Sequence, residues 1–143
     1  MTNVRNILRT KGDDVIVADP TLAVRDALRM MERDNVGSLM VVQDGRLVGL
    51  FTERDFARHA ASAGPPSLEA ALADVMVRDV LVVSPDTSID ECMALMTEKR
   101  TRHLPVFEDD RVVGIVSIGD IVKGLIADKE FTIEQLERYI TGH

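Results

Sequence analysis

The sequence has one cysteine, few aromatic residues and no tryptophan. The lone Cys92 excludes an internal disulfide and a CxxC metal site. Aromatic residues make up 3% of the chain, so its 45% hydrophobic content predicts an aliphatic core. No apolar run approaches the ~18 residues of a membrane span, and nothing at the start resembles a signal peptide. The net charge of −7 disfavours sequence-independent binding to nucleic acid and binding to an anionic membrane. We therefore predict a soluble, cytoplasmic protein that binds neither.

What the chain does contain is an internal repeat. The stretch "GLFTERD" at residues 49–55 corresponds to "GIVSIGD" at residues 114–120, an offset of 65 residues. The offset holds without a gap back to "VADP" and "VVSP", and it aligns Pro20 with Pro85 and Asp55 with Asp120. An ungapped match that shares Pro, Gly and Asp is not expected by chance. It indicates two copies of one structural unit.

Each copy predicts the same order of elements, β-α-β-β-α. A short apolar strand ends at a Pro, which cannot continue a central strand. A helix follows, with Val24, Ala27, Leu28 and Met31 at i, i+3, i+4 and i+7 in the first copy. Two strands joined by a tight acidic turn come next, and then a closing helix. On the helix of the second copy Cys92 replaces Ala27, which predicts a small buried side chain rather than a nucleophile.

We predict an α+β fold with one added helix at the C-terminal end. Division along the chain gives a first copy with an N-terminal helix, a second copy with a linker helix, and a C-terminal helical extension, over residues 1–63, 64–128 and 129–143. A Gly-Pro-Pro run at 64–66 marks the connection between the copies. Thr132 and Gln135 have capping-box spacing, which predicts a separate helix start. The extension serves either dimerisation or packing on its own chain.

Polar side chains stand where the last strand of each copy turns into its closing helix. These are Ser117 and Asp120, and their counterparts Thr52 and Asp55. They either cap the helix or face a ligand. A carboxylate can accept hydrogen bonds from both hydroxyls of a ribose, a nearby hydroxyl can reach a ribose or phosphate oxygen, and free N–H groups at a helix start favour an anion. Their occurrence in both copies favours a ligand.

The stretch "EKRTRHLPV" concentrates positive charge in an otherwise acidic chain. Arg102 and His103 lie directly before the middle strand of the second copy, where they could meet a phosphate. Surface salt bridges of Arg100 or Arg102 with Glu98 or Glu108, worth about 0–1 kcal/mol, are the alternative. A partly buried structural histidine is the alternative for His103.

Two β-α-β-β-α copies, each ending in G-h-h-[ST]-x-x-D, resemble a tandem pair of CBS domains, also called a Bateman module. The resemblance extends from about Val4 to Asp128, and "RHLPV", "GIVSIGD" and "GLFTERD" are typical of it. It implies that the copies pack with pseudo-two-fold symmetry around clefts for adenosine-containing regulatory ligands, such as AMP, ADP, ATP, S-adenosylmethionine or NAD. It also implies a homodimer, and it leaves the effector protein unidentified.

The resemblance further implies that each cleft takes residues from both copies. The cleft of Ser117 and Asp120 would also hold Arg102, His103, Ile16, Val36 and Gly37. The cleft of Thr52 and Asp55 would also hold Gly37, Ser38, Arg54, Leu81, Thr101 and Arg102. Because the first copy has Gly37 and Ser38 where the second has Arg102 and His103, we expect the Asp120 cleft to be the stronger phosphate site.

The predicted function is therefore a non-catalytic, signal-sensing module with an adenosine nucleotide as its regulatory ligand. We expect no catalytic cofactor and no metal, since the sequence shows no nucleophile triad, metal-ligand cluster or P-loop. Guanine nucleotides are a minor alternative ligand. The alternative function is a structural dimerisation or adaptor module whose clefts do not bind nucleotide.

Overall fold

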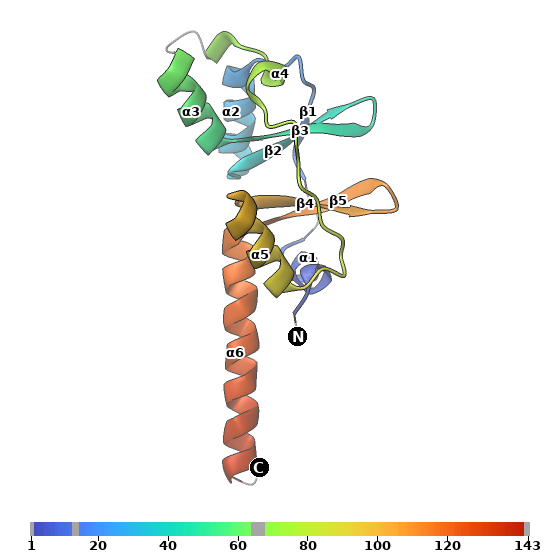
Figure 1. Cartoon of the computed structure of the whole chain (residues 1–143), viewed down its shortest axis with the longest axis vertical. Coiled ribbons are helices and arrows are strands. Elements are labelled where there is room, and N and C mark those ends of the chain that lie inside the picture. The colour runs from blue at the N-terminus through green and yellow to red at the C-terminus, as the bar shows by residue number, and fades with distance from the viewer. Residues whose placement is uncertain (1, 13–14, 64–67, 142–143) are drawn as a thin grey trace. The chain divides into compact units, whose positions relative to one another are not determined.

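The structure, a computed structural model, describes residues 2–12, 15–63 and 68–141 (Figure 1). Helices and short strands follow one another in the predicted order in both copies, which confirms the α+β class. The chain forms two compact units. We call Asp14–Leu81 the first-copy unit, and Met1–Asp13 with Val82–His143 the second-copy unit. The predicted connection at 64–66 lies outside the described residues.

The first-copy unit is a three-stranded sheet with helices. Its elements are β1 (Val17–Ala18), α2 (Val24–Asp34), β2 (Ser38–Gln43), β3 (Arg46–Thr52), α3 (Glu53–Ala63) and α4 (Leu72–Val75). The strand order is β1-β2-β3, with β1 parallel and β3 antiparallel to β2. Val24, Ala27 and Met31 on the predicted face of α2 are buried in the unit's core with Leu39 and Phe51 of the sheet. The helical period therefore identified the core face correctly.

The second-copy unit has a similar order of elements, with a two-stranded sheet and a longer closing helix. Its elements are α1 (Val4–Lys11), α5 (Ile89–Lys99), β4 (His103–Glu108), β5 (Arg111–Ser117) and α6 (Ile118–Thr141). The β4–β5 pairing matches β2–β3: Leu104 lies opposite Val116 as Leu39 lies opposite Phe51. Cys92 is fully buried on α5, as Ala27 is on α2, which confirms the prediction for the thiol.

One predicted strand of the second copy shrinks to a single bridge, which joins Val83 to Val106. In the first-copy unit the amide of Met40 donates to Ile16 O at 3.0 Å. The residue at the same place in β4 is Pro105, which has no N–H to donate. The missing donor explains why the short apolar strand predicted before Pro85 is reduced to this bridge.

The two short helices before the repeats pack in exchanged positions. The amides of Val4 and Arg5 in α1 donate to Thr87 O and Pro85 O, at 2.9 and 2.8 Å. The amides of Leu72 and Ala73 in α4 donate to the corresponding carbonyls of the first copy, Leu22 O and Pro20 O, each at 2.9 Å. Helix α1 thus packs on the second copy and α4 on the first. The compact units therefore do not coincide with the division by chain order at residues 63 and 64.

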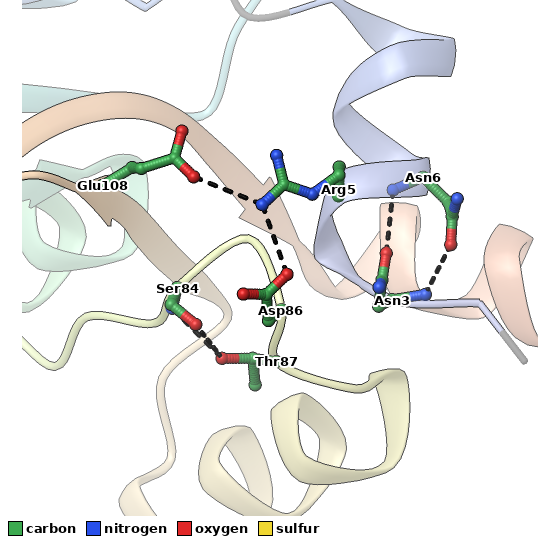
Figure 2. A network of polar contacts seen from close by, with 7 residues as sticks. All are labelled: Asn3, Arg5, Asn6, Ser84, Asp86, Thr87 and Glu108. Atoms are coloured by element: carbon green, nitrogen blue, oxygen red, sulfur yellow. Dashed lines mark hydrogen bonds and ion pairs between the residues drawn. The ribbon is translucent and has the colours of Figure 1, made fainter.

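Polar side chains hold α1 in the second-copy unit as well (Figure 2). The guanidinium of Arg5 donates to Asp86 and Glu108, each at 3.2 Å. Asn3 and Asn6 form a reciprocal capping box at the start of α1. Glu108 pairs with Arg5, and neither Arg100 nor Arg102 forms an ion pair among the described residues.

Helix α6 is continuous over 24 residues, so the prediction of a separate helix start near Thr132 was wrong. The hydroxyl of Thr132 donates instead to Asp128 O one turn earlier, at 3.0 Å. No Gly or Pro interrupts the stretch between these residues, and its side chains are compatible with a helix. The amide of Thr2 donates to the carboxylate of Asp128, while Phe131, Ile133 and Leu136 beyond it are exposed.

Candidate functional site

The strand-to-helix junction of each copy is a capping box. The amide of Ser117 donates to Asp120 Oδ2 at 2.8 Å, and the amide of Asp120 donates to Ser117 Oγ at 3.2 Å. Thr52 and Asp55 exchange the same two bonds, each at 3.1 Å. The hydroxyl residue is thus the cap, and the aspartate three residues later completes the capping box.

Capping leaves part of each carboxylate available. All the hydrogen bonds described for Asp120 and Asp55 use Oδ2. Within the described residues, Oδ1 of either side chain accepts no hydrogen bond. Both aspartates are half-buried, so a ligand can approach them. A helix cap and a ligand acceptor can therefore be the same residue.

The second-copy junction brings four predicted site residues to one end of the β4–β5 hairpin. His103 lies opposite Ser117 in the strand pairing, and the amide of Ile118 donates to Arg102 O at 2.9 Å. Arg102 is exposed and His103 half-buried. The hydroxyl of Thr101 donates to His103 O at 3.1 Å, which holds the chain before β4. Arg102, His103, Ser117 and Asp120 thus lie at the same end of this hairpin.

The first-copy junction has the same backbone but different side chains. Ser38 lies opposite Thr52, and the amide of Glu53 donates to Gly37 O at 3.4 Å. Arg54 is exposed in the first turn of α3, while Ser38 is buried. This end of the β2–β3 hairpin therefore lacks the cation that Arg102 supplies directly before β4.

The remaining predicted site residues lie in the unit of their own copy, except Leu81, which chain order places in the second copy but which lies in the first-copy unit. Ile16 and Val36 pack against the core of the first-copy unit, and Leu81 is its last residue. Thr101 belongs to the second-copy unit. Each predicted cleft therefore needs residues from both units. That these residues form one cleft stays a prediction.

Sequence reasoning missed one residue at the second-copy junction. Lys11 Nζ donates to Asp120 Oδ2 at 2.7 Å and to Ile115 O at 3.0 Å. Burial alone would raise the pKa of Asp120, but the hydrogen bonds from Lys11 and from the amide of Ser117, with the charge of Lys11, hold it below its ordinary value. Lys11 lies outside the duplicated stretch, and no local pattern pointed to it.

In the part of the chain that the structure describes, neither the cysteine nor the acidic and histidine side chains form a second candidate site. Burial, followed by the charge of Glu91, raises the pKa of the Cys92 thiol to about 11, so the thiolate is scarce at neutral pH. Among the described residues, no group of three or more His, Cys, Asp and Glu side chains is placed to hold a metal ion. None of the described helices is long and apolar enough to cross a membrane.

Comparison with known proteins gives the same picture. The CBS domain family matches residues 4–62 and again residues 72–127. The chain is 34% identical over 152 residues to the mitochondrial CBS domain-containing protein CBSX3 of Arabidopsis thaliana, covering 99% of this chain and 73% of that protein.

Solved structures show the same fold. A CBS-domain containing protein of Agrobacterium tumefaciens is 36% identical, with a TM-score of 0.83 over 85% of this chain and 98% of that one. The CBS domain pair of protein MJ0100, in complex with 5′-methylthioadenosine and S-adenosyl-L-methionine, is 28% identical, with a TM-score of 0.78 over 90% and 98%. With its two matched copies, this chain belongs to the CBS domain family as a tandem pair.

Proposed function

We propose that the chain is a regulatory module that binds an adenosine-containing ligand at the Ser117–Asp120 junction. The observation that carries the proposal is the arrangement of Asp120, whose Oδ1 is unused within the described residues, beside Arg102 and the first turn of α6. A ribose diol can donate to the carboxylate, and the start of a helix attracts a phosphate. That the CBS pair of MJ0100 is in complex with two adenosine-containing compounds supports this ligand class.

The ligand we expect is AMP, ADP, ATP or NAD, and the module we expect is non-catalytic. Ser117 Oγ accepts the amide hydrogen of Asp120 at the start of α6, and Cys92 is buried, so neither fits the role of a nucleophile. A homodimer and an effector protein complete the proposal. The cytoplasm is the compartment predicted from the sequence, whereas the Arabidopsis relative is named as mitochondrial.

The test is calorimetric titration with AMP, ADP, ATP, NAD, S-adenosylmethionine, methylthioadenosine and GTP, supported by thermal shifts. A ligand at about 100 times its Kd adds about 2.7 kcal/mol, which is roughly 5–10 °C for a chain of this size. Asp120→Ala should weaken binding at least about tenfold, since hydrogen bonds to a charged acceptor are worth ~1.5–3 kcal/mol each. Asp55→Ala should weaken it less.

Asp90→Ala is the matched control, because Asp90 is an exposed acid in the first turn of α5 of the same unit. It should leave affinity unchanged. Equal losses from Asp120→Ala and Asp55→Ala would contradict the ranking of the two junctions.

A structural adaptor is the second candidate function, and the end of α6 favours it. Phe131, Ile133 and Leu136 are 63%, 55% and 56% exposed on the part of the helix that follows Asp128. Apolar side chains this exposed are suited to a protein partner. If protein shown to be free of nucleotide gives a flat titration panel at millimolar ligand, the adaptor function replaces the sensor.

A further inference from the structure

The ion pair between Lys11 and Asp120 differs from the other ion pairs of the described residues. The Lys11 and Asp120 side chains are 32% and 16% exposed, whereas every partner in the others is at least 38% exposed. An ion pair that is partly shielded from water is screened less by salt. Lys11 thus places a persistent positive charge at the candidate ligand site.

Packing of α1 across β5 fixes the position of Lys11. Val4 and Ile7 are buried, and Leu8 lies so close to Gly114 that a Cβ there would meet Leu8 Cδ2 at 2.6 Å. Lys11 follows Leu8 by about one turn and is the last residue of α1. The helix ends there because Gly12 adopts φ 93°, and its amide donates to Leu8 O at 2.8 Å. The ammonium group therefore reaches the end of β5 from a well-anchored helix.

Among the described residues of the first-copy unit, no cation takes the place that Lys11 has beside Asp120. Directly after α4, Met76 lies over Gly49 as Leu8 lies over Gly114, and its sulfur would contact a Cβ added there. The next cation, Arg78, donates to Ala73 O at 2.7 Å. Among the described residues Asp55 forms no ion pair. The difference between the junctions therefore includes Lys11 as well as Arg102.

We propose that Lys11 is part of the Asp120 ligand site and makes it select phosphorylated adenosine compounds over S-adenosylmethionine and methylthioadenosine. This inference rests on the proposed function. Two of the three N–H groups of Lys11 are used by Ile115 O and Asp120 Oδ2, and the third is available to a ligand oxygen. Lys11 and Arg102 carry two positive charges, and Asp120 carries one negative charge. The resulting net positive charge attracts a phosphate, does not attract a neutral thioether and repels a sulfonium.

The test compares Lys11→Met with Arg9→Met by calorimetric titration of AMP, ATP, S-adenosylmethionine and methylthioadenosine. Arg9 is an exposed cation on the same helix, so its replacement makes the same change in net charge. Lys11→Met should lower the affinity for AMP and ATP by about tenfold or more. It should change the affinity for methylthioadenosine by less than about twofold and raise the affinity for S-adenosylmethionine. Lys11→Arg should keep most of the nucleotide affinity, and Arg9→Met should change none of the four.

Three outcomes overturn the inference alone. Two of them are unchanged nucleotide affinity in Lys11→Met and an equal loss for all four compounds, which would indicate a purely structural lysine. A wild-type protein that prefers S-adenosylmethionine to ATP also overturns it while leaving the proposed function intact. If wild-type protein binds no adenosine compound, the proposed function fails and the inference fails with it. Unfolding of each variant without ligand is measured alongside, so that loss of folded protein is separated from loss of affinity.

Discussion

The two units share a backbone plan but differ in charge at the same place. Each has a helix that donates two amides to equivalent carbonyls, a glycine in contact with that helix or with the residue after it, and a Ser/Thr-x-x-Asp capping box. Only at the second-copy junction does Lys11 pair with the aspartate and Arg102 stand directly before the neighbouring strand, whereas Gly37 and Ser38 stand at the first. Local folding explains the shared bonds in both units, so the chemistry that distinguishes a ligand site must come from the residues that differ.

The largest expected effect tests which helix belongs to which unit. Ile7→Ala and Leu72→Ala each remove a buried side chain from a short helix and should each cost about 2–5 kcal/mol of unfolding free energy. Ile7→Ala should speed the hydrogen exchange of the backbone amides in β4 and β5, although Ile7 precedes the first copy in the chain. Leu72→Ala should speed those of β2 and β3.

Arg9→Ala and Asp74→Ala, exposed positions on the same two helices, serve as controls and should stay within about 0.5 kcal/mol of wild type. Faster exchange in β2 and β3 on replacement of Ile7 would mean that α1 packs with the copy it precedes, and would contradict the exchanged arrangement.

The repeat, the strand pairs and the buried face of α2 could all be predicted because each depends on residues near one another in the chain. The partners of α1 and α4 could not. Val4 and Ile7 indicate that α1 has a buried face, but an apolar face fits either copy equally well. The ion pair of Lys11 and Asp120 joins residues 109 apart, and no period or spacing connects them.

Two errors in the sequence analysis have local causes. Capping-box spacing at Thr132 predicted a helix start, but such spacing matters only where the preceding chain leaves the helix, and around Asp128 it does not. The strand predicted before Pro85 is reduced to a bridge because Pro105 removes one donor of the ladder on the neighbouring strand.

A smaller effect tests the two aspartates as structural groups. Asp120→Asn loses the Lys11 pair and weakens the capping bond, so it should cost about 1–2 kcal/mol at neutral pH. Asp55→Asn has no ion pair to lose among the described residues and should cost less. Urea denaturation of both variants and wild type, in the absence of ligand, measures the difference.

The cost of Asp120→Asn should also depend on pH. The folded-state pKa of Asp120 lies below its ordinary value of 3.8, so the stabilisation by its charge is fully present above that value. It is lost as the pH falls through the lowered folded-state pKa. The stability difference from wild type should therefore narrow on acidification below about pH 4. A difference that grows in acid would contradict the ion pair with Lys11.

The smallest effect concerns the left-handed residues that end α2 and α5. Asn35 has φ 53° and Arg100 has φ 54°, yet asparagine adopts this conformation more readily than arginine. Arg100→Gly should therefore raise the free energy of unfolding by roughly 0.5–1 kcal/mol, and Asn35→Gly by only a few tenths. Urea denaturation measures the change in unfolding free energy of each variant.

Because Arg100 also lies in the basic stretch before β4, AMP affinity should be measured in the same variants. Unchanged affinity in Arg100→Gly would assign this arginine to the helix end, whereas weaker binding would extend the difference in charge between the two junctions to a third cation.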